Sequence, residues 1–317
     1  MLLPFSPSDP TTQALKADPS RWRDAARALC DRHAITMTEL TPYPDGAALV
    51  AAVSDDAVIK IIQPPYRDEW EREGWAQGLL LRATLPIEIP RLLASGESPD
   101  GWTYLISSRV HGTLLKDVWP SMDAPRRAEL LSEIGRAMAA VHAVRLVSQR
   151  LARRAWDTLV TAQLAGCRAR HARLAMPQWL LDGCETYARA AVAEMPSGTD
   201  LVLLTGEYTP FNLLAEERGG RWALTGMVDF GDAMEGPREY DWIGPGVFLC
   251  AGDAELLHAF LRGYRGAEGA LDDADRRTLM ALHLIHRFAD LDRQIALRGW
   301  RERAESLDQL AALLWPR

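Results

Sequence analysis

The chain is poor in cysteine, and the few cysteines it has are scattered. They are Cys30, Cys167, Cys184 and Cys250, and they form no CxxC pair and no cluster with histidine. Zinc sites and the disulfide frameworks of small secreted domains both need closely or regularly spaced cysteines. The sequence therefore gives no reason to expect a metal–thiolate centre or a disulfide scaffold.

Long apolar runs are missing as well. No segment approaches the roughly 20 consecutive apolar residues that a membrane-spanning helix needs. The pattern of a secretory signal, a basic segment followed by an apolar one, is not found after Met1. We therefore expect a cytoplasmic protein with no membrane partner.

An excess of basic residues is also absent. The chain has 36 Lys and Arg against 43 Asp and Glu, which gives a formal net charge of −7. Nucleic-acid-binding domains usually carry a basic face, so we expect no nucleic-acid partner. A cationic small molecule is compatible with this charge. Lysine itself is rare, since Lys16, Lys60 and Lys116 are the only three, and the place of each is therefore informative.

The 317 residues, 48% of them hydrophobic, suit two lobes around a cleft. The most informative stretch follows the apolar run Leu201–Leu204, where residues 205–207 read Thr-Gly-Glu and Asn212 comes five positions after the acid. Two apolar segments with a Gly-Gly between them then predict a β-hairpin over 213–228. This hairpin runs directly into an Asp-Phe-Gly sequence at 229–231.

An acid, an Asn five positions later and an Asp-Phe-Gly after a hairpin form the layout of a kinase catalytic core. Mg²⁺ prefers a few hard oxygen ligands from the protein, because phosphate oxygens and water complete its octahedron. The pattern predicts Glu207 as the catalytic base and Asn212 and Asp229 as the metal ligands. Each piece alone has a plainer interpretation, such as a turn residue for Asp229, and it is the ordered set that favours a phosphotransferase.

An apolar strand upstream ends in a lysine, at Ala57-Val58-Ile59-Lys60. Such a lysine must reach solvent or pair with an anion, and kinases use one at this place to bind phosphate. The helix that should follow, over 68–82, carries three glutamates that could pair with it: Glu69, Glu71 and Glu73. We expect Glu73 to be the partner, because it directly precedes the apolar stretch that should face the lobe.

These residues resemble the aminoglycoside phosphotransferase family, and within it the hygromycin-type O-phosphotransferases. The family pattern is His-Gly-Asp-x-x-x-x-Asn, then Ile-Asp-Phe/Trp-x-Asp, then a Gly-Asp-x-x-Tyr-Asp run. This chain matches it at Asn212, at 228–232 and at Tyr240-Asp241. It departs from it at two positions, because Thr205 stands in place of the His and Glu207 in place of the catalytic Asp.

The resemblance implies a bilobal α+β fold of the protein-kinase type, with a small antiparallel-sheet N-lobe and a larger, mainly helical C-lobe. We expect an arm and helix over 1–34, the N-lobe over 35–108 and the C-lobe over 109–317. The connector between the lobes, including Ser108 and Val110, would contact the nucleotide base through its backbone.

The resemblance also implies a reaction. The donor would be ATP or GTP with Mg²⁺, and the acceptor a hydroxyl of an aminoglycoside-like antibiotic, with the enzyme acting as a monomer. Two alternatives stay open. The acceptor could be another small alcohol, or Glu207 could mark a pseudokinase that binds nucleotide without turnover.

Several local expectations can be compared with the structure. We expect a loose arm over 1–18, then a helix as far as His33, and a turn over 41–46 at the place of the phosphate loop. His142 should be an ordinary buried histidine at the end of its helix. His283, Arg287 and Asp290 should share one face of a salt-bridged amphipathic helix, the alternative being that this face borders the acceptor pocket. Further elements are expected as follows: strands Ile35–Leu40, Ala47–Val53 and Ala57–Ile62, and helices Asp123–Val144, Ala254–Tyr264, Asp272–Arg298 and Leu310–Trp315.

Overall fold

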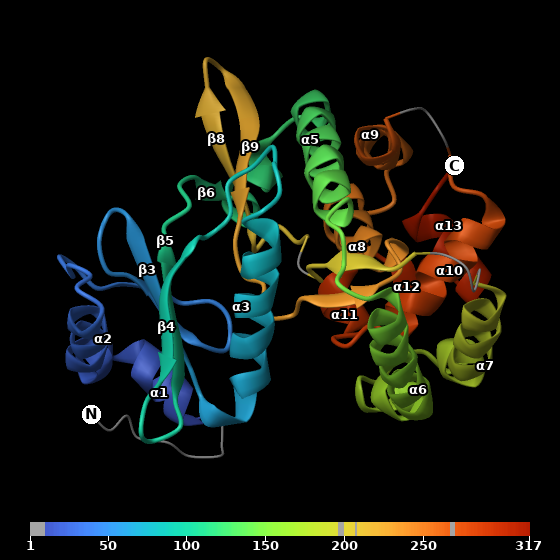
Figure 1. Cartoon of the computed structure of the whole chain (residues 1–317). Helices are drawn as coiled ribbons and strands as arrows, with labels where there is room; N and C mark the ends of the chain where they lie inside the picture. Colours follow the sequence, from blue (N-terminus) through green and yellow to red (C-terminus); the bar gives the residue numbers. More distant parts are fainter. Residues whose placement is uncertain (1–9, 196–199, 207, 267–269) are drawn as a thin grey trace. The chain divides into compact units, whose positions relative to one another are not determined.

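The computed structural model describes residues 10–195, 200–206, 208–266 and 270–317. The chain divides into two compact units. The first unit comprises Met1–Arg82, Glu88–His111 and Gly226–Asp232, and the second comprises Ala83–Ile87, Gly112–Thr225 and Ala233–Arg317. The predicted α+β class is confirmed, because one unit is built on a small antiparallel sheet and the other is mainly helical (Figure 1).

The first unit contains a five-stranded antiparallel sheet with the strand order β1-β2-β3-β5-β4. In this sheet Lys60 lies opposite Val50 on one side and Leu105 on the other. The strands are β1 (Thr41–Tyr43), β2 (Leu49–Ala52), β3 (Ala57–Ile62), β4 (Leu92–Glu97) and β5 (Thr103–Ser108). The helices of this unit are α1 (Pro10–Ala17), α2 (Ser20–Arg32), a 3₁₀ turn (Pro64–Tyr66) and α3 (Arg67–Leu80).

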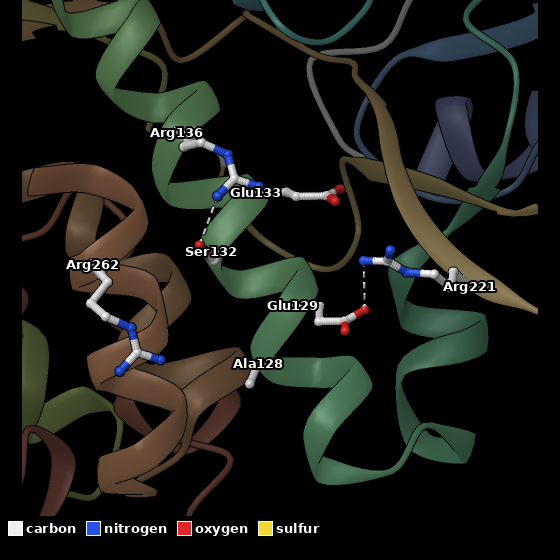
Figure 2. Close-up of a pocket in the computed structure, with 7 residues that line it drawn as sticks. All are labelled: Ala128, Glu129, Ser132, Glu133, Arg136, Arg221 and Arg262. Atoms are coloured by element: carbon white, nitrogen blue, oxygen red, sulfur yellow. Dashed lines mark hydrogen bonds and ion pairs between the residues drawn. The ribbon is translucent and has the colours of Figure 1, made fainter. Parts of the chain in front are cut away.

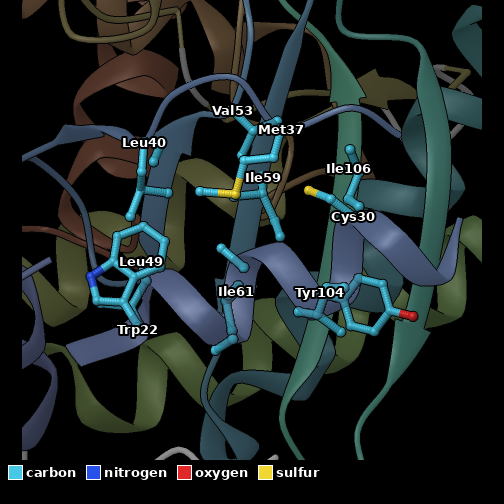
Figure 3. Packing of buried hydrophobic residues seen from close by; sticks show 14 of the residues in the cluster. Trp22, Cys30, Met37, Leu40, Leu49, Val53, Ile59, Ile61, Tyr104 and Ile106 are labelled. Atoms are coloured by element: carbon cyan, nitrogen blue, oxygen red, sulfur yellow. The ribbon is translucent and has the colours of Figure 1, made fainter. Parts of the chain in front are cut away.

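The two faces of this sheet are covered by different helices. Alternate residues of β3 point to opposite faces, so Ile59 and Ile61 enter a core with Trp22 of α2 (Figure 3). Ile62, on the other face, belongs to a smaller cluster that Trp70 of α3 packs against. The same alternation places Lys60 on the α3 face, which decides what its ammonium can reach.

Two expectations for this unit are wrong. Residues 10–17 form helix α1 rather than a loose arm, and its Leu15 is completely buried; residues 1–9 lie outside the described residues. No strand forms over Ile35–Leu40, because the N–H groups of Thr38 and Glu39 both bond to one carbonyl, that of Val53, instead of forming a ladder.

The first strand starts later, at Thr41, inside the segment expected to be a turn. Pro42 is tolerated there because β1 is an edge strand. The turn at the expected place of the phosphate loop is therefore shorter and follows Tyr43, with Gly46 at φ 83°.

The second unit is built mainly from helices, with two small sheets of order β10-β7 and β6-β8-β9. Its strands are β6 (Thr113–Leu114), β7 (Val202–Leu204), β8 (Leu213–Arg218), β9 (Arg221–Met227, whose last two residues belong to the first unit) and β10 (Met234–Gly236). Its helices are α4 (Leu115–Val118), a 3₁₀ turn (Trp119–Ser121), α5 (Ala124–His142), α6 (Gln149–Arg173), α7 (Gln178–Glu194), α8 (Glu239–Gly244), a π-helical segment (Pro245–Cys250), α9 (Ala254–Arg265), α10 (Asp273–Leu284), α11 (Leu291–Gln294), α12 (Trp300–Arg303) and α13 (Leu307–Leu314).

Most of the expected elements of the second unit are confirmed. Helix α5 begins where Asp123 caps it by accepting the Arg126 N–H at 3.0 Å. The hairpin of β8 and β9 is also confirmed, with Gly219 and Gly220 both at positive φ in its turn (Figure 1). None of the helices within the described ranges is long and apolar enough to span a membrane.

The long helix expected over Asp272–Arg298 is wrong. Helix α10 ends at Leu284, and the chain turns before α11 begins. The carbonyl of Leu284 accepts hydrogen bonds from Arg170 Nη2 at 3.1 Å and His171 Nε2 at 3.0 Å, both on α6. These side chains take the place of the helical N–H that would continue α10, so the residues after Leu284 do not form one helical face with those before it.

Candidate active site

A buried lysine lies between two carboxylates in the first unit. Lys60 Nζ on β3 is 2.8 Å from Glu73 Oε2 on α3 and 2.8 Å from Asp229 Oδ1, in the segment after β9. Glu73 is only 5% exposed. An ammonium buried at this depth needs an anionic partner, and here it has two.

The charges of this cluster depend on one another. Burial acts to lower the pKa of Lys60, but the carboxylates of Asp229 and Glu73 outweigh it and raise that pKa above its usual value. Burial raises the pKa of Glu73, with Lys60 opposing the rise. For Asp229, burial would raise the pKa, but the ion pair with Lys60 and the N–H of Gly231 lower it overall. Lys60 therefore stays protonated and Asp229 ionised at any ordinary pH.

Asp229 has an uncommon backbone conformation, and the two oxygens of its carboxylate have different environments. Its φ is 68°, in the left-handed region that non-glycine residues seldom adopt. Oδ1 accepts from Lys60 and from the Gly231 N–H at 3.1 Å, whereas Oδ2 accepts no hydrogen bond from any described residue. The side chain is 42% exposed. Oδ2 is thus available to a cation, and this donor fits Mg²⁺, which takes few protein oxygens.

Only one of the three candidate glutamates contacts Lys60. Glu71 instead pairs with Arg67 at 3.2 Å, near the surface. Glu69 has no ion pair with Lys60, but the charges of Lys60 and Asp229 both act on its carboxylate. Burial raises the pKa of Glu69 to about 7, with Lys60 opposing the rise. The sequence offered no sign that this second carboxylate would be so strongly perturbed.

The remaining metal ligand and the base were expected in the second unit. Asn212 follows a tight turn, in which its own N–H and that of Leu213 bond to the Thr209 carbonyl at 3.2 and 3.3 Å. The Asn212 side chain is half-buried. Glu207 lies outside the described residues. Among the residues that are described, no three His, Cys, Asp or Glu side chains converge as a metal cage would require.

A buried carboxylate supports the segment just before Glu207. Asp241 Oδ2 accepts the Thr205 N–H at 3.0 Å, and Oδ1 accepts the Gly206 N–H at 2.9 Å. His142, the last residue of α5, lies with Nε2 3.1 Å from the same Oδ2 and Nδ1 2.8 Å from the Tyr264 hydroxyl. His142 is therefore the buried helix-end histidine that we expected. Sequence reasoning placed Asp241 in the motif but missed this bracing contact.

Ser108 and Val110, the two connector residues, differ in which of their backbone groups are free to form a hydrogen bond. The N–H of Ser108, the last residue of β5, is already bonded to the Arg91 carbonyl at 2.8 Å. Val110 is 8% exposed, and its backbone groups make no backbone hydrogen bond within the described residues. Of the two, Val110 is thus better placed to bind a nucleotide base.

A pocket of about 300 Å³ lies on the second unit, and none of the residues expected in the site lines it (Figure 2). Three of its charged side chains have partners, since Arg136 donates to Ser132 Oγ at 2.8 Å and Arg221 lies 3.3 Å from Glu129. No ligand is needed to explain this arrangement. The lining residues are Ala128, Glu129, Ser132, Glu133, Arg136, Arg221 and Arg262.

The family can now be identified. The model of the phosphotransferase enzyme family (APH) matches residues 39–282, well over half of the sequence. The chain belongs to this family, and the resemblance deduced from its motifs is confirmed. By this membership it is a phosphotransferase.

Solved structures show the same fold at low sequence identity. The GDP complex of aminoglycoside 2'-phosphotransferase-IIIa is 16% identical, with a TM-score of 0.64 over 92% of this chain and 96% of that chain. The streptomycin–ATP complex of APH(2")-IIa is also 16% identical, with a TM-score of 0.58 over 86% and 93%. Spectinomycin phosphotransferase with ADP and spectinomycin is 13% identical, with a TM-score of 0.59 over 92% and 98%.

Proposed function

We propose that this phosphotransferase moves the γ-phosphoryl group of Mg²⁺-bound ATP or GTP to a hydroxyl of an aminoglycoside-like antibiotic. The observation that supports this best is the contact of one buried lysine with both Glu73 and Asp229. A permanently protonated lysine beside an acid with a free oxygen is suited to hold phosphate and metal together. Since ATP and GTP are cytoplasmic donors, we place the enzyme in the cytoplasm, as a monomer.

Each residue has a role in this proposal. Lys60 binds the phosphates, and Glu73 holds its ammonium in place. Asn212 and Asp229 are the metal ligands, in keeping with the family motif. Glu207 accepts the proton of the attacking hydroxyl. Mg²⁺, when bound, neutralises charge on the phosphates, so that positioning and electrostatics supply most of the catalysis. The backbone at Ser108 and Val110 would meet the nucleotide base.

One observation favours a second candidate for the acceptor. Helix α6, which we assign to the acceptor side of the site, has a single acidic residue, Asp157. It carries six arginines: Arg150, Arg153, Arg154, Arg168, Arg170 and Arg173. A polycationic acceptor would be repelled by that helix. This charge supports an acceptor alcohol that is neutral or that carries an anionic group.

The experiment is nucleotide binding followed by an acceptor screen. Mg²⁺ with ATP or GTP at about 100 times its dissociation constant should stabilise the protein by about 2.7 kcal/mol, seen as a raised melting temperature. Phosphorylated products are then sought by mass spectrometry in a panel of aminoglycosides and of uncharged or acidic alcohols. An unchanged melting temperature with both nucleotides would remove the kinase proposal.

The pseudokinase alternative rests on Glu207 in place of Asp. If Glu207 is the base, Glu207→Gln abolishes transfer to any acceptor found in the screen and leaves nucleotide binding intact. A rise in transfer for Glu207→Asp would instead identify the natural protein as a weakened kinase. The longer side chain displaces its carboxylate on the scale of ~1 Å, which is enough to change rates about 10²-fold.

A further inference from the structure

The turn that carries Asp229 is held by α3 through two consecutive residues. Glu73 pairs with Lys60, whose ammonium in turn contacts Asp229 Oδ1. Arg72, directly before it, donates from Nε to the Gly231 carbonyl at 2.7 Å. Neighbouring helix positions point about 100° apart, so α3 acts on this turn in two ways, directly through Arg72 and by way of Lys60 through Glu73.

All three guanidinium nitrogens of Arg72 have partners. Besides the bond from Nε, Nη1 lies 2.5 Å from Asp68 Oδ2, one turn earlier on α3. Nη2 lies 3.9 Å from Asp232 Oδ1, the residue after Gly231. Asp68 thus orients the guanidinium, and the other two nitrogens reach the turn. Arg72 is only 24% exposed, so it is more than a solvated surface charge.

The Asp229 turn needs such support. Asp229 has a left-handed backbone that costs about 1–2 kcal/mol for a residue other than glycine. Among the described residues of the turn its carboxylate has one hydrogen-bond partner, the Gly231 N–H, which donates to Oδ1. The direction of Oδ2 therefore depends on where Gly231 is held, and the Gly231 carbonyl is the atom that Arg72 binds.

We infer that Arg72 is a positioning residue for the metal ligand Asp229, and that it couples the place of α3 to the affinity for the metal–nucleotide complex. This inference rests on the proposed function. Arginine is suited to the task, because its planar group presents several donors in fixed directions, whereas lysine is a point charge on a flexible stem.

The test measures nucleotide affinity twice for each variant, once with Mg²⁺ and once with EDTA. In the natural protein Mg²⁺ should tighten binding of ATP or GTP. In Arg72→Gln this tightening should fall by about 10- to 100-fold, the usual effect of removing a partner of a metal ligand. Affinity without metal should be unchanged, because Lys60 and Glu73 remain paired.

Two variants make the result specific. Arg67→Gln removes an arginine from the same helix that pairs with Glu71 and Glu97 at the surface, and it should leave the Mg²⁺ effect unchanged. Arg72→Lys keeps the positive charge but lacks the planar group with several donors, so it should resemble Arg72→Gln. Because it is the milder change, it also serves as the test if Arg72→Gln fails to fold.

The outcomes separate the inference from the proposed function. Restoration of the Mg²⁺ effect by Arg72→Lys would overturn the inference, because charge alone would then suffice. Equal weakening with and without metal in Arg72→Gln would also overturn it, since that marks a general structural role. Absence of any Mg²⁺ effect in the natural protein would overturn the proposed function itself, before any variant is compared.

Discussion

The position of Lys60 in its strand determines which partners its ammonium can reach. It lies in the middle of a buried sheet, and its alternation with Ile59 and Ile61 points it to the α3 face. There it must have anionic partners, since an unpaired buried ammonium is very costly. The strand pattern and the rarity of lysine predicted that Lys60 must reach solvent or an anion, and the order of the motifs predicted Glu73 as its partner; the face of the sheet came from the structure.

Asp229→Asn tests the metal role at the same scale. Asparagine tolerates a left-handed backbone and keeps an oxygen for Lys60 and the Gly231 N–H, so the fold should persist. The negative charge is lost, and we expect turnover to fall by about 10²-fold or more. Binding of nucleotide should no longer be tightened by Mg²⁺. The measurement is a steady-state assay beside nucleotide titrations with Mg²⁺ and with EDTA.

An exposed acid provides the control for that variant. Asp55→Asn, in the turn before β3, removes the same charge from the same unit and should change neither quantity. If Asp229→Asn kept its full Mg²⁺ response, Asp229 would be a turn residue and no more.

At the scale of elements, helices α5 and α9 pack unusually closely through two glycines. A Cβ added at Gly135 would lie 2.3 Å from the Phe260 carbonyl oxygen, and one added at Gly263 would lie 2.1 Å from that of Ser132. These distances leave no room for even a methyl group, and the obstructing atoms are backbone. The two glycines are therefore required by the helix contact rather than by their φ angles.

We expect Gly263→Ala to lower the free energy of unfolding by about 1–3 kcal/mol, the usual cost of overpacking. Gly166→Ala, in α6, is the matched control, because its nearest neighbour would be a flexible arginine nitrogen 3.7 Å away. There the gain in helix propensity should stabilise by about 0.5–1 kcal/mol. Denaturant unfolding of both variants gives the comparison. Changes of the same sign in the two would contradict the close contact.

Local sequence patterns predicted elements well where local interactions decide them. The Asp123 cap and the apolar stripe behind it placed α5, and the Gly219-Gly220 pair placed the β8–β9 hairpin. These local patterns failed where a side chain from a distant part of the sequence determines where an element ends. Helix α10 stops at Leu284 because Arg170 and His171 bind its carbonyl, from more than a hundred residues earlier.

In the candidate site, too, some residues follow from local patterns in the sequence and others only from contacts between distant segments. Lys60 and Asp229 could be found because kinase-type chemistry requires their types and order. The contact of Arg72 with Gly231 joins residues 159 positions apart, and no local rule connects them. Asp241 likewise supports Thr205 and Gly206 through a contact that only the folded chain brings about.

At the scale of the whole molecule, buried histidines link stability to pH. Three of them lie in the second unit, on α6 and around the end of α10: His171, His283 and His286. Burial lowers the pKa of His283 to about 4 and that of His286 to about 3, and it also lowers the pKa of His171. His283 and His286 are therefore neutral in the folded protein across the mildly acidic range.

The sign of the effect follows from this difference. In the unfolded chain each histidine takes up a proton near pH 6.5, whereas in the folded chain His283 and His286 do so only near 4 and 3. As the pH falls below about 6.5, the unfolded state gains protons that the folded state does not, so stability falls. Each such histidine contributes about 1.4 kcal/mol per pH unit until its own folded pKa is reached.

We therefore expect the free energy of unfolding to decline steeply from pH 6.5 towards pH 4, as measured by denaturant titrations at several pH values. His283→Gln removes one titrating group while keeping a neutral polar side chain. It should reduce the slope by about 1.4 kcal/mol per pH unit, whatever it does to stability at pH 8. An unaltered slope in His283→Gln would show that the histidine is already protonated in the folded state, and that its burial does not control the response to acid.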